Sequence, residues 1–199
     1  MKNVSVGVYE FDELSKSVQD KVIERYRDKL ADFLNEELED IMSWKLNNYV
    51  DNLDFELSYS LNYCQGDGVS FTGSVEGKEE LFTLAGLVYG NKVPKNIIRL
   101  IKWDIIYKVD FVRNSYHYVH RYTVQTNINK NYNSFKAYYY ISRIIAEFEK
   151  AIDKWRLQTC GTLEEFGYDT IINLYSDDNI KNYIKENERN FFIDGRDFL

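Results

Sequence analysis

The chain contains few of the residues that usually mark a metal site or a disulfide framework. Its 199 residues include two cysteines, two histidines and one proline. Cys64 and Cys160 stand alone in the sequence and match neither a set of disulfides nor a metal-binding pair. We therefore expect no metal, no cofactor and a reducing compartment, in which cysteines stay as thiols.

Long apolar runs and known nucleotide motifs are also missing. No stretch approaches the roughly 18 apolar residues that span a bilayer. Met1 to Glu10 has an alternating pattern with one lysine, unlike the basic start and apolar block of a signal peptide. The glycines at 66 and 68 lack the Lys and Ser/Thr of a phosphate loop. These absences predict a cytoplasmic protein that makes no use of a membrane.

The composition is that of a globular protein with unevenly distributed charge. Hydrophobic residues make up 44% of the chain and charged residues 29%, with a net charge of -7. Residues 92–143 hold 10 Lys/Arg against 2 Asp/Glu, a net of +8, and the segments on both sides are acidic. This basic block could face an anionic partner, or the acidic flanks a basic one. Alternatively, acidic helices could cover a basic sheet within the protein.

Hydrophobic periodicity predicts one α+β domain over residues 1–199, an antiparallel sheet covered by helices. Strict alternation is typical of strands with one buried face, and helical spacing of apolar residues indicates amphipathic helices. The expected elements are a short strand over 4–8, N-terminal helices over 12–50, a hairpin over 53–75, a hairpin over 103–126, a polar loop over 127–133, and C-terminal helices over 134–188. The longest C-terminal helix is expected to end near Gly161.

The most distinctive stretch is Gln65-Gly66-Asp67-Gly68, at the expected turn of the first hairpin. Two glycines permit positive φ and the close approach of a ligand. Gln65 and Asp67 would then present an amide and a carboxylate at the rim of a binding site. A plain hairpin loop with an Asp-Gly turn is the structural alternative.

A second candidate lies between residues 116 and 122, where three tyrosines and both histidines occur. In a strand, Tyr116, Tyr118, His120 and Tyr122 share one face, whereas His117 and Arg121 share the other. The tyrosines could stack on bases while nearby cations hold phosphates, or they could simply lie on a buried sheet face. The candidate binding residues are Gln65, Asp67, Arg113, Tyr116, Tyr118, His120, Arg121 and Tyr122.

A catalytic interpretation requires Asp67 to meet His117 or His120 in space. A histidine beside a carboxylate can act as a general base. An enzyme that processes a nucleotide or nucleic acid is therefore the alternative hypothesis. No motif identifies catalytic residues, and we assign none.

Several stretches together resemble a widespread family of small bacteriophage and prophage proteins. They are Phe11–Ser15 with Ile23–Arg27, Tyr63–Phe71 with the pattern Gln-Gly-Asp-Gly-x-x-Phe, Tyr118–His120 with the pattern Tyr-x-His, and Ser176–Ile180 followed by Asn190–Gly195. The resemblance implies a phage accessory gene expressed in the bacterial cytoplasm, and it supplies no catalytic residues. We expect an anti-defence, anti-CRISPR-like inhibitor that occupies a host protein or ribonucleoprotein. Nucleic acid or a nucleotide at the basic block 92–143 is a further expected partner.

Overall fold

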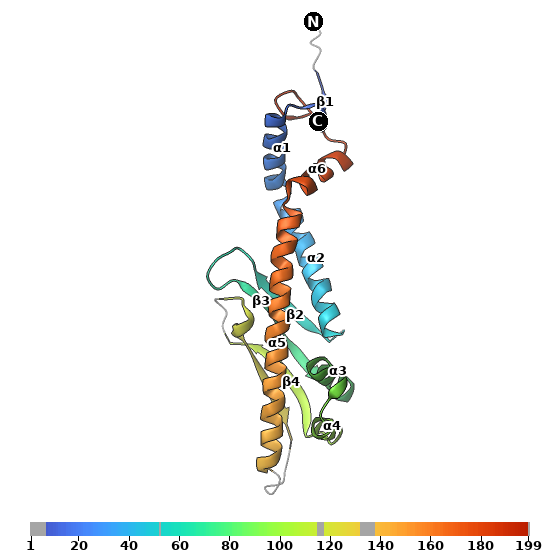
Figure 1. Cartoon of the computed structure of the whole chain (residues 1–199), viewed down its shortest axis with the longest axis vertical. Helices are drawn as coiled ribbons and strands as arrows, with labels where there is room; N and C mark the ends of the chain where they lie inside the picture. The colour runs from blue at the N-terminus through green and yellow to red at the C-terminus, as the bar shows by residue number, and fades with distance from the viewer. Residues whose placement is uncertain (1–6, 52, 115–117, 132–137, 199) are drawn as a thin grey trace. The chain divides into compact units, whose positions relative to one another are not determined.

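The α+β class expected from the sequence is confirmed by a computed structural model (Figure 1). The structure describes residues 7–51, 53–114, 118–131 and 138–198. Its helices are α1 (Lys16–Lys29), α2 (Ala31–Val50), α3 (Lys78–Tyr89), α4 (Lys95–Lys102), α5 (Tyr138–Leu174) and α6 (Asp177–Glu186). Its strands are β1 (Tyr9–Glu10), β2 (Phe55–Ser60), β3 (Gly68–Glu76), β4 (Ile106–Arg113), β5 (Val124–Lys130), β6 (Asn190–Phe191) and β7 (Asp197–Phe198). No helix within these ranges is long and apolar enough to cross a membrane.

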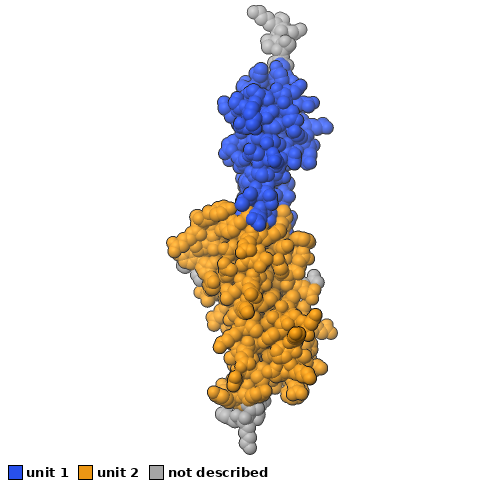
Figure 2. All heavy atoms as spheres, viewed as in Figure 1, with its two compact units in different colours: residues 1–40, 169–199 blue, residues 41–168 orange. Residues whose placement is uncertain are grey.

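The chain forms two compact units, which are coloured separately in Figure 2. Unit 1 comprises residues 1–40 and 169–199, and unit 2 comprises residues 41–168. Helices α2 and α5 contribute residues to both units. Each unit has its own antiparallel sheet, with strand order β1-β6-β7 in unit 1 and β2-β3-β4-β5 in unit 2.

The core of unit 1 forms where α1 meets the small sheet. The rings of Phe11 and Tyr26 contact the ring of Phe191 edge-on, at 6.4 and 6.1 Å between centroids. All three side chains are buried, and each contributes about 1.5–3 kcal/mol through the hydrophobic effect. Ser176 caps α6 as its sequence suggests, since its Oγ accepts a hydrogen bond from the amide of Asn179 at 3.2 Å.

Unit 2 is built on a four-stranded sheet whose two faces differ sharply. Phe55, Phe71 and Phe111 share the apolar face, and Trp155 of α5 contacts Phe71 and Phe111 there at 5.8 and 6.4 Å. Most alternate residues on the same strands are polar and at least partly exposed, among them Glu56, Ser58, Thr72, Ser74 and Asp110, although Ser70 on this face is buried. This is the one-sided burial typical of antiparallel sheets.

The second hairpin of unit 2 differs from the sequence-based expectation. Strand β4 lies where expected, but β5 begins only at Val124 and runs to Lys130. The prediction of a strand up to residue 126 is therefore wrong over 118–123, where residues 118–120 form no strand and Arg121–Thr123 form a 3-10 turn. The predicted polar loop is wrong over 127–130, because Ile128 and its neighbours pair with β4. The remaining parts of these predictions, residues 116–117 and 132–133, lie outside the described residues.

Two other element boundaries also differ. Helix α5 does not end near Gly161 but continues to Leu174. A β-carbon at Gly161 would lie 2.4 Å from Nη1 of Arg121, so this glycine makes room for a packed side chain and does not end the helix. The N-terminal strand is Tyr9–Glu10, whereas Gly7 and Val8 are not in a strand and residues 4–6 lie outside the described residues.

Candidate functional site

The loop between β2 and β3 is held closed by the carboxylate of Asp67. One oxygen of this carboxylate accepts a hydrogen bond from the hydroxyl of Ser60 at 2.6 Å. The other accepts from the backbone amides of Asn62 and Cys64, each at 2.7 Å. The amide of Cys64, then the Ser60 hydroxyl and the Asn62 amide, hold the pKa of Asp67 below its usual value. Asp67 is thus an ionised residue that organises the loop Gln65–Gly68, called the QGDG loop below.

The segment Tyr118–Thr123, called the tyrosine turn below, forms a compact turn next to this loop. Nδ1 of His120 accepts a hydrogen bond from the backbone amide of Tyr122 at 3.2 Å. The carbonyl of His120 accepts from the amide and the hydroxyl of Thr123, at 2.9 and 2.7 Å. An accepting Nδ1 leaves the proton of the neutral imidazole on Nε2. The His120 ring lies between Tyr118, stacked at 6.4 Å, and Tyr122, edge-on at 5.9 Å.

Two glycines bring the QGDG loop and the tyrosine turn into direct contact. A β-carbon at Gly66 would lie 2.2 Å from Cδ1 of Tyr118, and one at Gly68 would lie 2.9 Å from the β-carbon of His120. Gly66 also has φ of +94°, a backbone conformation that side chains rarely adopt. The glycines of the motif are therefore needed for contact with Tyr118 and His120 as well as for the turn itself.

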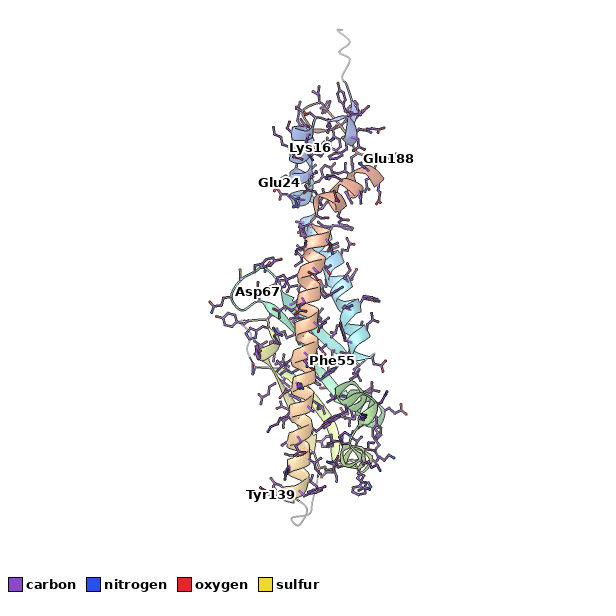
Figure 3. All side chains as sticks on the ribbon, in the orientation of Figure 1. Lys16, Glu24, Phe55, Asp67, Tyr139 and Glu188 are labelled. Atoms are coloured by element: carbon purple, nitrogen blue, oxygen red, sulfur yellow. The ribbon has the colours of Figure 1, made fainter. Side chains whose placement is uncertain are left out.

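Between the two segments lies an open cavity of about 390 Å³. Figure 3 labels Asp67, on the loop that projects to one side of α5. The cavity is lined by Gln65, Gly66, Asp67, Tyr118, His120, Arg121, Tyr122 and Glu164. The structure thus brings six of the predicted binding residues to a single site.

Helix α5 supplies the floor of this site. Nη2 of Arg121 lies 3.8 Å from Oε2 of Glu164, and the carbonyl of Arg121 accepts a 2.5 Å hydrogen bond from Nη1 of Arg156. Arg156 is buried, and it also contacts Asp153 at 3.2 Å. The sequence alone gave no indication of Glu164 and Arg156, because they lie more than 30 residues from Arg121 and only tertiary packing joins them.

The other predicted residues lie elsewhere or outside the described residues. Arg113 does not line the cavity, and its Nη2 lies 3.5 Å from the hydroxyl of Ser70. Tyr116 and His117 lie outside the described residues. One further aromatic residue near the loop was not predicted, since the exposed ring of Tyr63 packs on Tyr168 at 4.6 Å.

A second depression, of about 440 Å³, follows α5 away from the cavity and shares Arg121 and Tyr122 with it. Its remaining lining residues are Lys150, Asp153, Lys154, Leu157 and Gln158. We call Tyr118, His120, Arg121 and Tyr122 together the tyrosine surface. This surface is therefore open on both sides and is not enclosed in a deep pocket.

The groups at the site are poorly arranged for general base catalysis by Asp67. Its carboxylate already accepts three hydrogen bonds, and its lowered pKa makes it a weaker base than a free aspartate. Cys64 is exposed, and its thiol donates to the carbonyl of Asn62 at 3.5 Å. Among the residues that the structure describes, no group of three or more His, Cys, Asp or Glu side chains could hold a metal ion.

Comparison with known proteins gives no relative from which a role could be transferred. No family model matches the chain, and neither a curated protein nor a solved structure is significantly similar to it.

Proposed function

We propose that this protein is a phage-encoded accessory binding protein, an anti-defence inhibitor that acts by occupying a host protein or ribonucleoprotein. The observation that carries the proposal is the exposure of the tyrosine surface. Tyr118 and Tyr122 are 52% and 68% exposed although both belong to a turn fixed by hydrogen bonds. Tyrosine and arginine are the residues that most often dominate binding energy in protein interfaces. The QGDG loop adds glycine and an amide beside these rigid rings, a combination typical of binding loops.

The charges at the site favour contact with a protein over contact with a phosphate backbone. Arg121 lies beside Glu164, and Asp67 lines the same cavity. Two carboxylates and one arginine in the same site leave little net positive charge for phosphates, on which nucleic-acid binding depends. A protein partner can instead match mixed charges with its own and use the tyrosine rings as apolar contacts.

A protein that acts by occupying a surface needs no catalytic group. This agrees with the state of Asp67, whose carboxylate already accepts three hydrogen bonds within its own loop. The alternative, an enzyme acting on a nucleotide or nucleic acid, is favoured by one observation: Asp67 and His120 line the same cavity. The variant His120→Ala separates the hypotheses. If this variant loses all turnover of a nucleotide or nucleic acid but still binds its partner, the enzyme hypothesis is supported.

Affinity capture with matched variants tests the proposal. Tagged wild-type protein is compared with Tyr118→Ala/Tyr122→Ala and with the control Tyr139→Ala/Tyr140→Ala. The control tyrosines, at the start of α5, are 86% and 67% exposed, so both variants remove two solvent-exposed rings. We expect the first variant to capture at least about tenfold less partner than the wild type, and the control to capture as much as the wild type.

A biological readout accompanies the capture experiment. Bacteria that carry a CRISPR defence and express the wild-type protein are expected to allow plaque formation by a targeted phage. The control variant should do the same, whereas Tyr118→Ala/Tyr122→Ala should not. Equal capture and equal plaque counts for the two variants would contradict the proposal.

A further inference from the structure

A row of cations lies along one face of α4, separate from the tyrosine surface. The row consists of Lys92, Lys95, Arg99 and Lys102, called the α4 cation stripe below. The spacing of four and three residues places Lys95, Arg99 and Lys102 on one side of α4, and Lys92 ends the 3-10 turn that precedes the helix. All four are exposed, whereas Ile97, Leu100 and Ile101 on the opposite face of α4 are buried. The stripe is thus the outward face of a helix that is firmly packed on its other side.

The segment that carries the stripe has no acidic residue. Residues 81–103 contain no aspartate or glutamate. Among the described residues, no ion pair includes any of the four cations. The first acid after the stripe, Asp104, is paired with Lys78 at 2.8 Å. By contrast, Arg121 and Lys108 of the same basic block each lie beside a carboxylate. The four cations of the stripe are therefore a group of unpaired charges within the block.

An exposed indole stands at the end of the stripe. Trp103 is the C-terminal cap of α4, one residue after Lys102, and it is 68% exposed. Leaving a large aromatic ring in water forgoes the free energy of its burial. An indole beside unpaired cations is the arrangement with which proteins hold single-stranded nucleic acid, since the ring stacks on a base while the cations contact phosphates.

We infer that the α4 cation stripe and Trp103 bind single-stranded nucleic acid. A membrane does not fit this surface, because an interfacial helix must insert an apolar face and the apolar face of α4 is buried in unit 2. A duplex uses the cations but leaves the indole without a base to stack on. The cations of the stripe match the phosphates and the Trp103 ring matches an unpaired base, so a single strand is the nucleic acid that fits both features.

This inference goes beyond the proposed function and uses different residues. Within unit 2, the stripe belongs to α4, whereas the tyrosine surface lies at the QGDG loop and α5. Figure 1 shows α4 on one side of α5, and Figure 3 shows Asp67 on the other. A partner that combines protein with RNA could contact both surfaces, but each surface is tested separately.

The test measures binding of a fluorescein-labelled 15-nucleotide oligothymidylate by fluorescence anisotropy, over a range of salt concentrations. The variant Lys95→Gln/Arg99→Gln/Lys102→Gln is compared with the control Lys16→Gln/Lys21→Gln/Lys185→Gln, which makes the same change in net charge at exposed lysines of unit 1. Each lost phosphate contact lowers the salt slope by about 0.7, so we expect the stripe variant to lose about 2 from the slope. It should also bind at least about tenfold more weakly at low salt, and the control should bind like the wild type.

The stacking contribution is tested with a second pair of variants. Trp103→Ala is expected to weaken binding about 5- to 150-fold, the range found for loss of one stacked base. Trp44→Ala removes another exposed indole, 61% exposed on α2, and should have no effect. Circular dichroism of each variant establishes that it is folded.

The outcomes that overturn the inference are distinct from failure of the proposed function. Equal losses in the two triple variants, or equal binding of a 15-base-pair duplex, polyglutamate or phosphatidylserine vesicles, would each contradict it. Tyr118→Ala/Tyr122→Ala should bind the oligonucleotide normally, so loss of partner capture in that variant leaves this result unchanged.

Discussion

The contact between Gly66 and Tyr118 makes the candidate site testable through stability alone. Gly66 has φ of +94°, and a β-carbon placed there would lie 2.2 Å from Cδ1 and 2.9 Å from Cε1 of the Tyr118 ring. Gly66→Ala therefore introduces two costs, backbone strain and a clash that forces the ring outward. The two costs can be separated because only the second depends on Tyr118.

The magnitudes follow from the structure. A side chain at positive φ costs about 1–2 kcal/mol. Tyr118 is about half-exposed, so displacing it returns about 100 Å² of surface to water, worth at most about 2.5 kcal/mol. We expect Gly66→Ala to lower the free energy of unfolding of unit 2 by about 2–4 kcal/mol. In the Tyr118→Ala background only about 1–2 kcal/mol should remain.

Urea denaturation followed by tryptophan fluorescence provides the assay. The three tryptophans, Trp44, Trp103 and Trp155, all lie within residues 41–168, so their emission reports on unit 2. Gly77→Ala is the matched control, because Gly77 has φ of +90° and a β-carbon added there would have no atom within 4 Å. It should cost about 1–2 kcal/mol in both backgrounds.

The double-mutant cycle can refute the reasoning directly. If Gly66→Ala costs no more than Gly77→Ala, or costs the same with and without Tyr118, the tyrosine turn does not pack on the QGDG loop. The cavity and the tyrosine surface would then lose their structural basis.

Three further predictions concern the cores, pH and the thiols. Phe71→Ala should lower the free energy of unfolding by about 3–5 kcal/mol, because the ring is fully buried against Phe55, Phe111 and Trp155. Urea denaturation measures this loss, and a loss below about 1 kcal/mol would contradict the packing. Burial, and then the charge of Asp197, raise the pKa of Tyr26 to about 12, so its contribution to stability is complete below pH 10 and is lost as the pH rises towards 12. Absorbance titration should show this late phenol and Tyr26→Phe should remove it, whereas titration of every tyrosine near pH 10 would refute it. Cys64 is exposed, whereas burial raises the pKa of the Cys160 thiol to about 11. A thiol reagent should therefore modify one cysteine in the native protein and two in denaturant. Fast modification of both cysteines in the native protein would contradict this.

The sequence was sufficient to predict those features that depend on local periodicity. Alternation from Leu53 onwards predicted the first hairpin, and β2 and β3 are present and paired. The predicted Asp67-Gly68 turn is wrong, because the amide of Asp67 donates to the carbonyl of Cys64 around Gln65 and Gly66, and Gly68 already begins β3. The strand ends at Ser60, earlier than the alternation suggests, because the Asp67 carboxylate captures the amides of Asn62 and Cys64. Local composition thus predicted the loop, but its hydrogen bonds set where the strand stops.

Features that depend on tertiary packing could not be predicted in this way. Tyr118, His120 and Tyr122 alternate as in a strand, yet Nδ1 of His120 caps a 3-10 turn that keeps these rings together on one side. Gly161 looks like the end of a helix, but it accommodates Arg121 within α5. Glu164 joins the site only because α5 continues past that glycine. The hydrogen bond of His120 is local, whereas Gly161 and Glu164 contact Arg121, which lies in a distant part of the chain.

Site-specific crosslinking in bacterial cells tests the central claim most directly. A photoreactive benzoylphenylalanine replaces Tyr122 in one variant and Tyr139 in a control variant. We predict that irradiation joins the position-122 variant to a discrete host protein and that the position-139 variant gives no such product. Identical products from both positions, or none from position 122, would contradict the claim that the tyrosine surface holds the partner.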